Sequence, residues 1–346
     1  MSTQPTPFGW HPAPLADSDG RVTAFYQAPS GELRTALTAT DIVKIVRSEA
    51  GRLWVDVDCH HTTWWLALAE TIGFHPLTIE DTLSPESRVK VEEYGDFLFV
   101  VCRDAQFSVD TPDPYDFATS NLYLFIGRTY LITVHALPSR ATETLRERLV
   151  SGPELMNRGV DYLAYAILDT LTDLYFPLLD QLDHFVDQLE ADIFSSADPT
   201  ETLERIFELK RTLLALRRHQ APMREITSTL ANRPTAYLQP ATQLYFRDVY
   251  DHVVRQVESI ETYRDLLTGA LEVHFSVLSN RTNEIMKALA IVGTFLLPAT
   301  WIASIYGMNF ESMPFLHEAG GFWIAMVSMF SVSLALLAYL KFRKWI

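Results

Sequence analysis

Hydrophobic residues are concentrated in two long segments near the end of the sequence. Residues Ala288–Phe310 and Ala319–Leu340, which are 23 and 22 residues long, contain no charged side chain. A helix needs about 20 apolar residues to cross the hydrocarbon core of a lipid bilayer. A buried core helix of a soluble protein usually keeps a polar face. The pattern therefore predicts two transmembrane helices, at 288–310 and 319–340, rather than a pair of buried core helices.

The linker between these segments has only eight residues, 311–318, and predicts an antiparallel hairpin with an external loop. Both flanks of such a hairpin lie on the same side of the membrane. Lys341, Arg343 and Lys344 give the tail at 341–346 a positive charge, and the positive-inside rule places such tails in the cytoplasm. The N-terminal sequence has neither the basic leader nor the apolar stretch of a secretory signal. We therefore expect a multi-pass protein of the cell (inner) membrane with both termini in the cytoplasm.

The sequence upstream of the first apolar segment follows a helical repeat. The 57 residues between Pro240 and Pro298 contain no proline and two glycines. A single helix of that length would extend roughly 85 Å. Its apolar positions alternate at spacings of four and three, with His274 among them: Tyr250, Val253, Val257, Ile260, Leu267, Leu271, His274, Leu278 and Ile285. Since a heptad seam needs partner helices, we expect a packed stalk helix at 241–287 that continues into the membrane helix at 288–310.

The N-terminal part alternates between strand-like and helix-like patterns. Runs rich in β-branched and aromatic residues predict strands at Arg21–Gln27, Arg52–Asp58, Asp96–Phe107, Asn121–Ile126 and Thr129–His135. Helical patterns lie between them, at Thr62–Ile72 and Ser139–Val150. We expect a flexible N-terminus at 1–20, a cytoplasmic α/β domain at 21–150 and a cytoplasmic helical region at 151–240, interrupted at Pro222, Pro234 and Pro240. The fold class is α+β with membrane helices.

The charge is distributed unevenly along the 346 residues. The chain has 28 Lys+Arg and 43 Asp+Glu, which gives a formal net charge of −15. Five basic and three acidic residues lie from Arg281 onward, so the preceding part has 23 basic and 40 acidic residues and a net charge of −17. An acidic domain argues against a nucleic-acid partner, which requires a basic surface. It is compatible with divalent cations as partners.

Catalytic and zinc-binding patterns are missing from the sequence. It has no glycine-rich phosphate loop and no nucleophile elbow, so we do not expect an enzyme. Cys59 and Cys102 cannot supply a four-cysteine zinc site and are expected to be reduced in the cytoplasm. The adjacent His60 and His61 lack a Cys/His cluster at zinc-site spacing. His75, which precedes Pro76, is expected to shape the start of a helix.

The end of the first apolar segment reads Tyr306-Gly307-Met308-Asn309-Phe310. It closely resembles the Gly-Met-Asn signature of the CorA family of divalent-cation channels, where the signature also closes the penultimate membrane helix. Further motifs look like the family's outer loop and cytoplasmic domain: Met313-Pro314, Trp54-Val55-Asp56, His75-Pro76-Leu77 with Glu80-Asp81, and Lys90-Val91-Glu92. The resemblance covers the chain from about residue 50. The sequence departs from the family at Phe315-Leu316, where Glu-Leu is frequent, and at Ser87-Arg88-Val89, where Gln-Arg-Pro is common.

The resemblance implies a funnel-shaped homopentamer in the bilayer, in which the first membrane helices line the pore of a passive channel for Mg²⁺, with Co²⁺ or Ni²⁺ as further ions. Gly307, Met308 and Asn309 would form its selectivity filter. Mg²⁺ gives up its water reluctantly, so a ring of Asn309 amide oxygens would bind the hydrated ion; the alternative is that Asn309 only caps the helix. The implied pore positions are Asn283, Met286, Leu289, Leu297 and Thr300, with Gly293, Ser304 and Glu272 on the same stripe. Apolar rings on this stripe would close the pore by dewetting, whereas the alternative is ordinary packing against the second membrane helix.

The resemblance also implies regulation by cytoplasmic Mg²⁺, so that Mg²⁺ is both transported and regulatory, with no organic cofactor. The residues that match the family's acidic positions are Glu80, Asp81, Asp183, Asp187 and Asp248. Carboxylates crowded at a subunit interface repel one another, and bound Mg²⁺ would hold the closed ring together. For each of these acids taken alone, the alternative is that it lies on a solvent-exposed helix face and binds no metal.

Two other functions remain open from the sequence. A ZntB-like zinc transporter shares the Gly-Met-Asn end, and His317 in the outer loop keeps zinc as an option. A membrane-anchored Mg²⁺ sensor without transport belongs to a different class. Ion flux measured with and without Asn309 distinguishes these functions from a Mg²⁺ channel.

Overall fold

The chain divides into two compact units. A computed structural model describes residues 22–58, 62–84, 87–107, 117–195, 198–309, 313–315, 318 and 320–343. The first unit comprises residues 1–191 and 204–268, and the second comprises residues 192–203 and 269–346. The expected flexible N-terminus, Cys59 and the pair His60-His61 lie outside the described residues.

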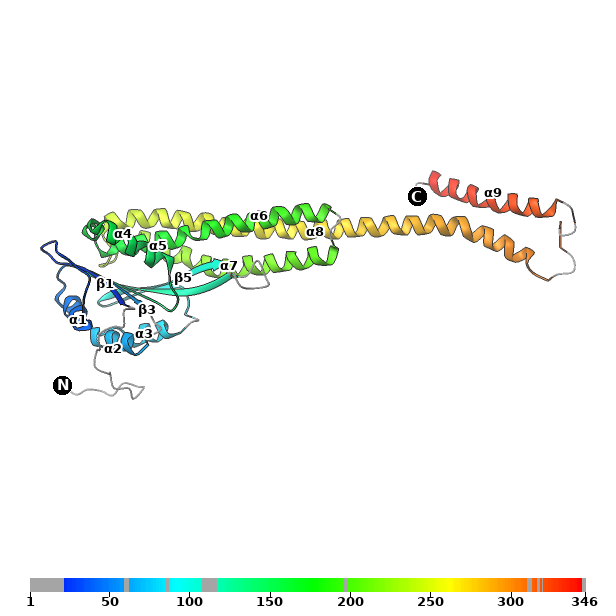
Figure 1. Ribbon diagram of the computed structural model, residues 1–346. Coiled ribbons are helices and arrows are strands. Elements are labelled where there is room, and N and C mark those ends of the chain that lie inside the picture. Colours follow the sequence, from blue (N-terminus) through cyan, green and yellow to red (C-terminus); the bar gives the residue numbers. More distant parts are fainter. Residues whose placement is uncertain are drawn as a thin grey trace. The chain divides into compact units, whose positions relative to one another are not determined.

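The first unit is built on a mixed sheet with the strand order β2-β1-β3-β7-β6-β5-β4 (Figure 1). Strands β3 and β7 pair in parallel, and all other neighbours in the sheet are antiparallel. The strands are β1 (Val22–Gln27), β2 (Leu33–Arg34), β3 (Arg52–Asp58), β4 (Lys90–Tyr94), β5 (Phe97–Phe107), β6 (Phe117–Ile126) and β7 (Tyr130–His135). The five strands expected from β-branched and aromatic runs are thus confirmed. Strand β6 begins four residues earlier than expected, and the short β2 and the charged β4 were not expected.

Helices cover both faces of this sheet (Figure 1). On one face lie α1 (Ala39–Ser48), α2 (Thr62–Ile72) and α3 (Pro76–Leu83), and on the other lie α4 (Arg140–Ser151) and α5 (Val160–Asp173), with a 3-10 turn at Pro153–Arg158 between these two. The fully buried Trp65 of α2 lies 5.4 Å, centroid to centroid, from the ring of Phe125. Its indole N–H donates to the Thr82 hydroxyl at 2.7 Å, so the buried polar group keeps a partner. His75 is the N-cap of α3, which confirms the expected helix start.

Three long helices follow: α6 (Tyr175–Phe194), α7 (Pro199–Asn232) and α8 (Pro240–Tyr306). The expected interruption at Pro222 is wrong, because α7 continues through this residue. Proline removes one backbone donor from a helix. Here Met223 and Ile226, which follow the proline by one and four residues, are buried and anchor the next turn in the core. Tertiary packing thus outweighs the local preference.

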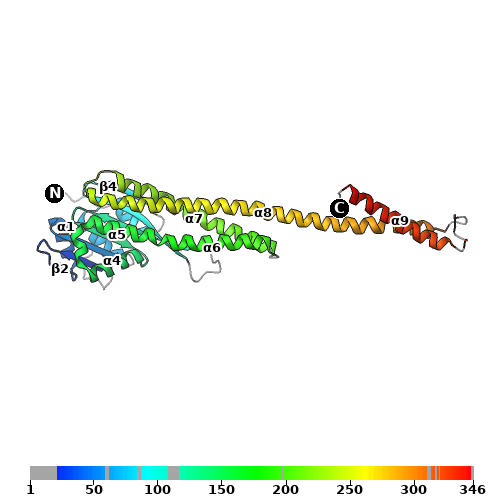
Figure 2. The same ribbon diagram turned by 90° about the horizontal axis from the view of Figure 1, so that it is seen from above.

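The heptad seam of α8 finds its partners within the same chain. Val253, Val257 and Ile260 are buried. In this part of the helix, the Gln256 side chain donates to the Thr172 carbonyl at 2.7 Å, and an Arg217 nitrogen of α7 lies 3.4 Å from a Glu261 oxygen. Both views show α7 and α8 side by side (Figures 1 and 2). The part of the seam around Val253–Ile260 therefore packs within the chain, whereas Ile285 at its end is 63% exposed.

The second unit contains both apolar segments. Helix α8 runs unbroken through the expected stalk and the first segment, and α9 (Gly321–Phe342) contains the second. Their most apolar windows have mean hydropathies of 1.9 and 2.0 and are 0% and 6% buried within the chain. A core helix would be mostly buried, so these surfaces fit a lipid or protein environment outside the chain. The expected fold class, an α/β domain joined by the long helix α8, which contains the first membrane-type segment, to a second membrane-type helix α9, is confirmed.

Candidate functional site

The last part of α8 is largely uncovered by the rest of the chain, and the expected pore positions form one stripe of this surface, which we call the open stripe. Met286, Leu289 and Leu297 have relative exposures of 59%, 65% and 71%. The other positions expected in the pore share this stripe at spacings of three and four, and all except the half-buried Gly293 are exposed: Asn283, Gly293, Thr300 and Ser304. Glu272 is also exposed and lies about three turns before Asn283 on the same helix. These residues therefore remain available to other copies of the chain.

The opposite face of α8 contacts α9. The Ser333 hydroxyl donates to the Phe295 carbonyl at 2.8 Å, and the rings of Phe295 and Phe330 are 6.1 Å apart. Leu297 follows Phe295 by two residues, which turns its side chain about 200° around the helix. Leu297 therefore points away from the α9 contact of Phe295 within the chain, and its role in a pore remains a prediction.

Hydroxyl groups on the stripe have unused acceptor capacity. The Thr300 hydroxyl donates to the Leu296 carbonyl, and the Ser304 hydroxyl donates to the Thr300 carbonyl, each at 2.8 Å. Once its proton is donated to the backbone, a hydroxyl oxygen keeps lone pairs that accept hydrogen bonds. The water shell of a cation presents donors outward, so such oxygens suit a hydrated ion. Pro298 lies within the same part of the helix, and α8 continues through it.

The Gly307-Met308-Asn309 sequence follows directly after the last turn of α8. Gly307 and Met308 donate backbone hydrogen bonds to Ala303 and Ile305, at 2.9 and 3.2 Å. A Cβ atom on Gly307 would lie 3.3 Å from the Ala303 carbonyl oxygen, so glycine permits a close approach here. All three residues are exposed in the single chain. Asn309 thus lies three residues beyond the end of α8, the helix that carries the open stripe.

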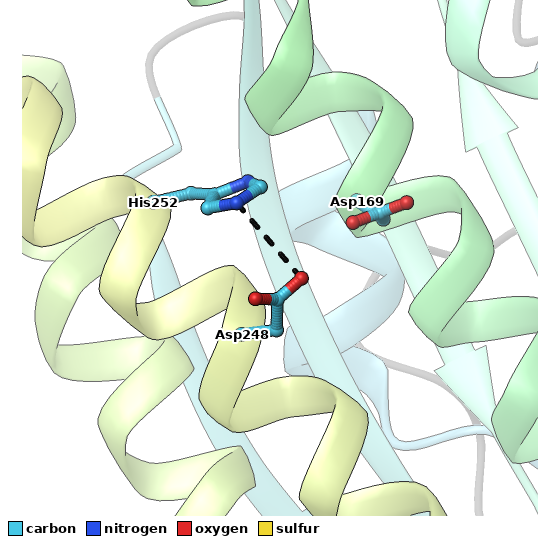
Figure 3. Close-up of side chains that lie close together, drawn as sticks. All are labelled: Asp169, Asp248 and His252. Atoms are coloured by element: carbon cyan, nitrogen blue, oxygen red, sulfur yellow. Dashed lines mark ion pairs between the residues drawn. The ribbon is translucent and has the colours of Figure 1, made fainter.

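Asp248 lies in a cluster of three side chains in the first unit that could hold a metal ion (Figure 3). Asp169 of α5 faces Asp248 and His252 of α8, and one ligand atom from each lies within 4.8 Å of the others. His252 Nε2 is 3.9 Å from the Asp248 carboxylate, and Nδ1 is 3.4 Å from Asp173. His252 Nδ1 is buried yet makes no hydrogen bond. Oxygen donors suit Mg²⁺, and an added imidazole suits Co²⁺ or Ni²⁺, so the donor set fits a divalent cation.

Burial and charge repulsion both act on this cluster. Burial raises the pKa of Asp169 above its usual range, and the neighbouring charge of Asp173 raises it further. Burial, followed by the charge of Asp169, raises the pKa of Tyr165 to about 12. The carboxylates therefore lie in a region of negative potential that a bound cation would relieve.

The other expected metal ligands lie apart from Asp248 within the chain. Glu80 is exposed, and Asp81 is 2.8 Å from Lys90 Nζ and accepts a hydrogen bond from the Ser87 hydroxyl. Asp183 and Asp187 are exposed on α6. Burial and then Asp183 raise the pKa of Tyr263 to about 12. Tyr263 follows Asp248 by fifteen residues, or roughly 22 Å along the helix, so one chain does not bring Asp183 and Asp248 together.

Comparisons with known proteins identify the family. The profile of the CorA-like Mg²⁺ transporter protein family matches residues 49–344, most of the chain. The chain belongs to the CorA-like Mg²⁺ transporter family. The cobalt/magnesium transport protein CorA of Thermotoga maritima is 33% identical over 89% of this chain and 88% of the relative. The putative metal ion transporter YfjQ of Bacillus subtilis is 29% identical over 88% and 93% of the two chains.

Solved structures agree with the fold of this CorA-like chain. The CorA magnesium transporter of Methanocaldococcus jannaschii superposes with a TM-score of 0.79 at 23% identity and covers 94% of this chain and 98% of its own. The full-length CmaX protein gives 0.75 at 21% identity, over 95% and 100% of the two chains. The likeness extends over both units, including α8 and α9. At these identities it shows the fold alone.

Three groups near Asp248 in the CorA-like chain were missed by sequence reasoning: Asp169, Asp173 and His252. A signal was present, because Asp169 and Asp173, like Asp248 and His252, are four residues apart and share one helix face. Such pairs are frequent on solvated helices and carry little information alone. Only the packing of α5 against α8 brings the two pairs together.

Proposed function

We propose that this protein is a passive channel that admits Mg²⁺, and also Co²⁺, into the cell. Members of its family are transporters or channels rather than enzymes. The observation that carries the proposal is the open stripe of α8, which ends at Gly307, Met308 and Asn309 on a membrane-type helix. A two-helix hairpin cannot enclose a water path, whereas a ring of five such helices can. The proposed assembly is therefore a homopentamer in the bilayer, with the N-terminal domain and the basic tail in the cytoplasm.

In this assembly the ion keeps its water shell. Five Asn309 side chains would accept hydrogen bonds from that shell at the outer mouth. Five Thr300 hydroxyls would repeat this contact inside the pore. Met286, Leu289 and Leu297 would form apolar rings that exclude water in the closed state. Glu272 and Asn283 would line the path on the cytoplasmic side.

Regulation is proposed at the acidic groups of the first unit. Cytoplasmic Mg²⁺ would bind the cluster of Asp169, Asp248 and His252, with Glu80 and Asp81 of a neighbouring copy completing the site. Asp183 and Asp187 would form a separate acidic position on α6. Bound Mg²⁺ relieves the repulsion only while the carboxylates stay close, so it favours the closed ring. Loss of the ion would loosen the interfaces and open the pore.

The zinc-transporter alternative is not favoured. The relatives that cover most of the chain include proteins named for cobalt and magnesium transport. The ZntB cytoplasmic domain of Vibrio parahaemolyticus matches with a TM-score of 0.60 at 15% identity. A likeness at this identity shows the fold alone.

Ion entry into liposomes tests the proposal. Wild type and Asn309→Ala are compared with Mg²⁺-sensitive and Zn²⁺-sensitive dyes, and Asn232→Ala, at an exposed asparagine in α7, is the matched control. We expect Mg²⁺ entry in wild type and Asn232→Ala, a loss of about tenfold or more in Asn309→Ala, and inhibition by Mg²⁺ on the cytoplasmic face. Proton-driven entry of zinc alone would restore the zinc-transporter alternative. A folded oligomer that passes neither ion after chelation would instead be the Mg²⁺ sensor.

A further inference from the structure

A cavity of about 450 Å³ lies in the first unit, at one end of the sheet. Its walls come from the β1–β2 and β6–β7 turns, the start of β3, the first turn of α5 with the residues before it, and the residue before α8. Polar groups dominate this lining: Gln27, Arg52, Arg128, Asn157, Asp161 and Gln239. None of them belongs to the pore stripe or to the Asp248 cluster.

Two guanidinium groups in this cavity have no carboxylate partner among the described residues. Arg52 Nη1 donates to the Gln27 side-chain oxygen at 3.2 Å, a neutral acceptor. Arg128 is exposed in the β6–β7 turn and forms no ion pair within the described part of the chain. The nearby Glu32 does not compensate them, because it pairs with Arg34 at 2.9 Å. The two positive charges are therefore available to a ligand.

The one carboxylate in the lining, Asp161, already accepts a hydrogen bond from a backbone N–H. Asp161 is 2% exposed, lies in the first turn of α5, and accepts a hydrogen bond from the Gln239 backbone N–H at 3.0 Å, directly before α8. Gly159, with φ of 109°, allows this arrangement, because a Cβ atom there would meet Asp161 Oδ1. The N-termini of two helices thus balance the charge of Asp161. The remaining charge of the cavity is positive.

We propose that this cavity binds a small phosphate-bearing molecule of about mononucleotide size. Guanidinium groups pair with phosphate oxygens through two parallel N–H donors, which gives both strength and orientation. A bare phosphate would leave most of the cavity unfilled, and volumes of about 300–1,000 Å³ are typical of sites for organic ligands. The amides of Gln27, Asn157 and Gln239 offer donors and acceptors to the remainder of such a ligand. The binding is independent of the proposed ion pathway.

Calorimetric titration of the full-length protein in nanodiscs tests this site. The probes are AMP, inorganic phosphate and adenosine, in buffer without divalent cations. AMP is the mononucleotide probe, and inorganic phosphate and adenosine represent its two parts. We expect one AMP per chain, weaker binding of phosphate and no binding of adenosine.

Variants connect the binding to the arginines. Arg128→Gln, at an exposed position that should tolerate the change, is expected to weaken AMP binding by about tenfold through loss of one charge-assisted pair. Arg52→Gln provides a second variant, and Arg146→Gln, at an exposed arginine of α4 outside the cavity, should bind AMP as wild type does. Absence of AMP binding, equal binding of adenosine and AMP, or binding that persists unchanged in both cavity variants would overturn the proposal.

Discussion

At the scale of single residues, the environment of a side chain differs from what its sequence neighbours suggest. Asp169 stands in an apolar helical pattern and has no motif around it, yet burial and Asp173 raise its pKa. Asp81 belongs to a recognisable Glu-Asp pair, yet in the single chain its carboxylate forms an ion pair with Lys90 at 2.8 Å. The sequence reveals residue types and spacing, whereas the partners of each charge depend on elements far along the chain.

The raised pKa of Asp169 predicts a pH effect on stability. A carboxyl group whose pKa is raised by folding favours the protonated form in the folded state, so its contribution is lost as pH rises from its ordinary value of 3.8 through the raised pKa. In divalent-free buffer, the free energy of unfolding should therefore fall less with rising pH in Asp169→Asn than in wild type. Chemical denaturation at several pH values measures the difference from wild type.

Thermal stabilisation by Mg²⁺ gives a second test of Asp169. Removal of one ligand should weaken Mg²⁺ binding to the cluster by at least about tenfold, which shifts the concentration needed for thermal stabilisation. Asp251→Asn, at an exposed carboxylate on α8, is the control and should behave as wild type. Equal Mg²⁺ stabilisation of wild type and Asp169→Asn would exclude Asp169 as a ligand.

At the scale of elements, the long helix α8 carries two different surfaces in succession. Its earlier part buries a heptad seam against α5 to α7, and its last part presents an apolar surface that the chain does not cover. Sequence periodicity correctly predicted one continuous helix. It could not tell whether the seam packs within the chain or between chains, because both arrangements require the same spacing of apolar residues.

Substitution in the seam distinguishes these two arrangements. Ile260 is 1% exposed within the chain, so Ile260→Ala should lower the free energy of unfolding by about 2–5 kcal/mol. Leu266, on the same helix, is 42% exposed, and Leu266→Ala should cost less than about 0.5 kcal/mol. Urea titration followed by tryptophan fluorescence measures both. The reverse order of effects would indicate a seam that faces neighbouring chains.

At the scale of the whole molecule, function requires contacts that one chain does not make. The exposed stripe of α8 turns away from α9, and Glu80 and Asp81 do not meet Asp248 within the chain. Membership of the CorA-like family and the fold likeness over nearly the full length agree with an assembly that uses both surfaces. The pentamer, the filter and the regulatory site are therefore proposed together.

A polar substitution in an apolar ring tests the assembled pore. Leu297→Asn should raise Mg²⁺ entry at high cytoplasmic Mg²⁺, because a polar ring stays wet when the closed pore would exclude water. Val292→Asn is the control, since Val292 is also exposed but lies five residues away, about 140° around the helix. Liposome flux measures both variants. Equal flux in Leu297→Asn and wild type would place Leu297 outside the constriction.

The sequence alone determined the features that depend on local composition and spacing. These are five of the seven described strands, the continuous α8 and the two membrane-type helices, since hydrophobic periodicity and uncharged runs are read over neighbouring residues. The tertiary structure decided which distant groups meet: Asp169 with Asp248, 79 positions apart, the α8 seam with α5 to α7, and Arg52 with Arg128 around one cavity. These contacts follow from the relative placement of helices and strands, which no local pattern specifies.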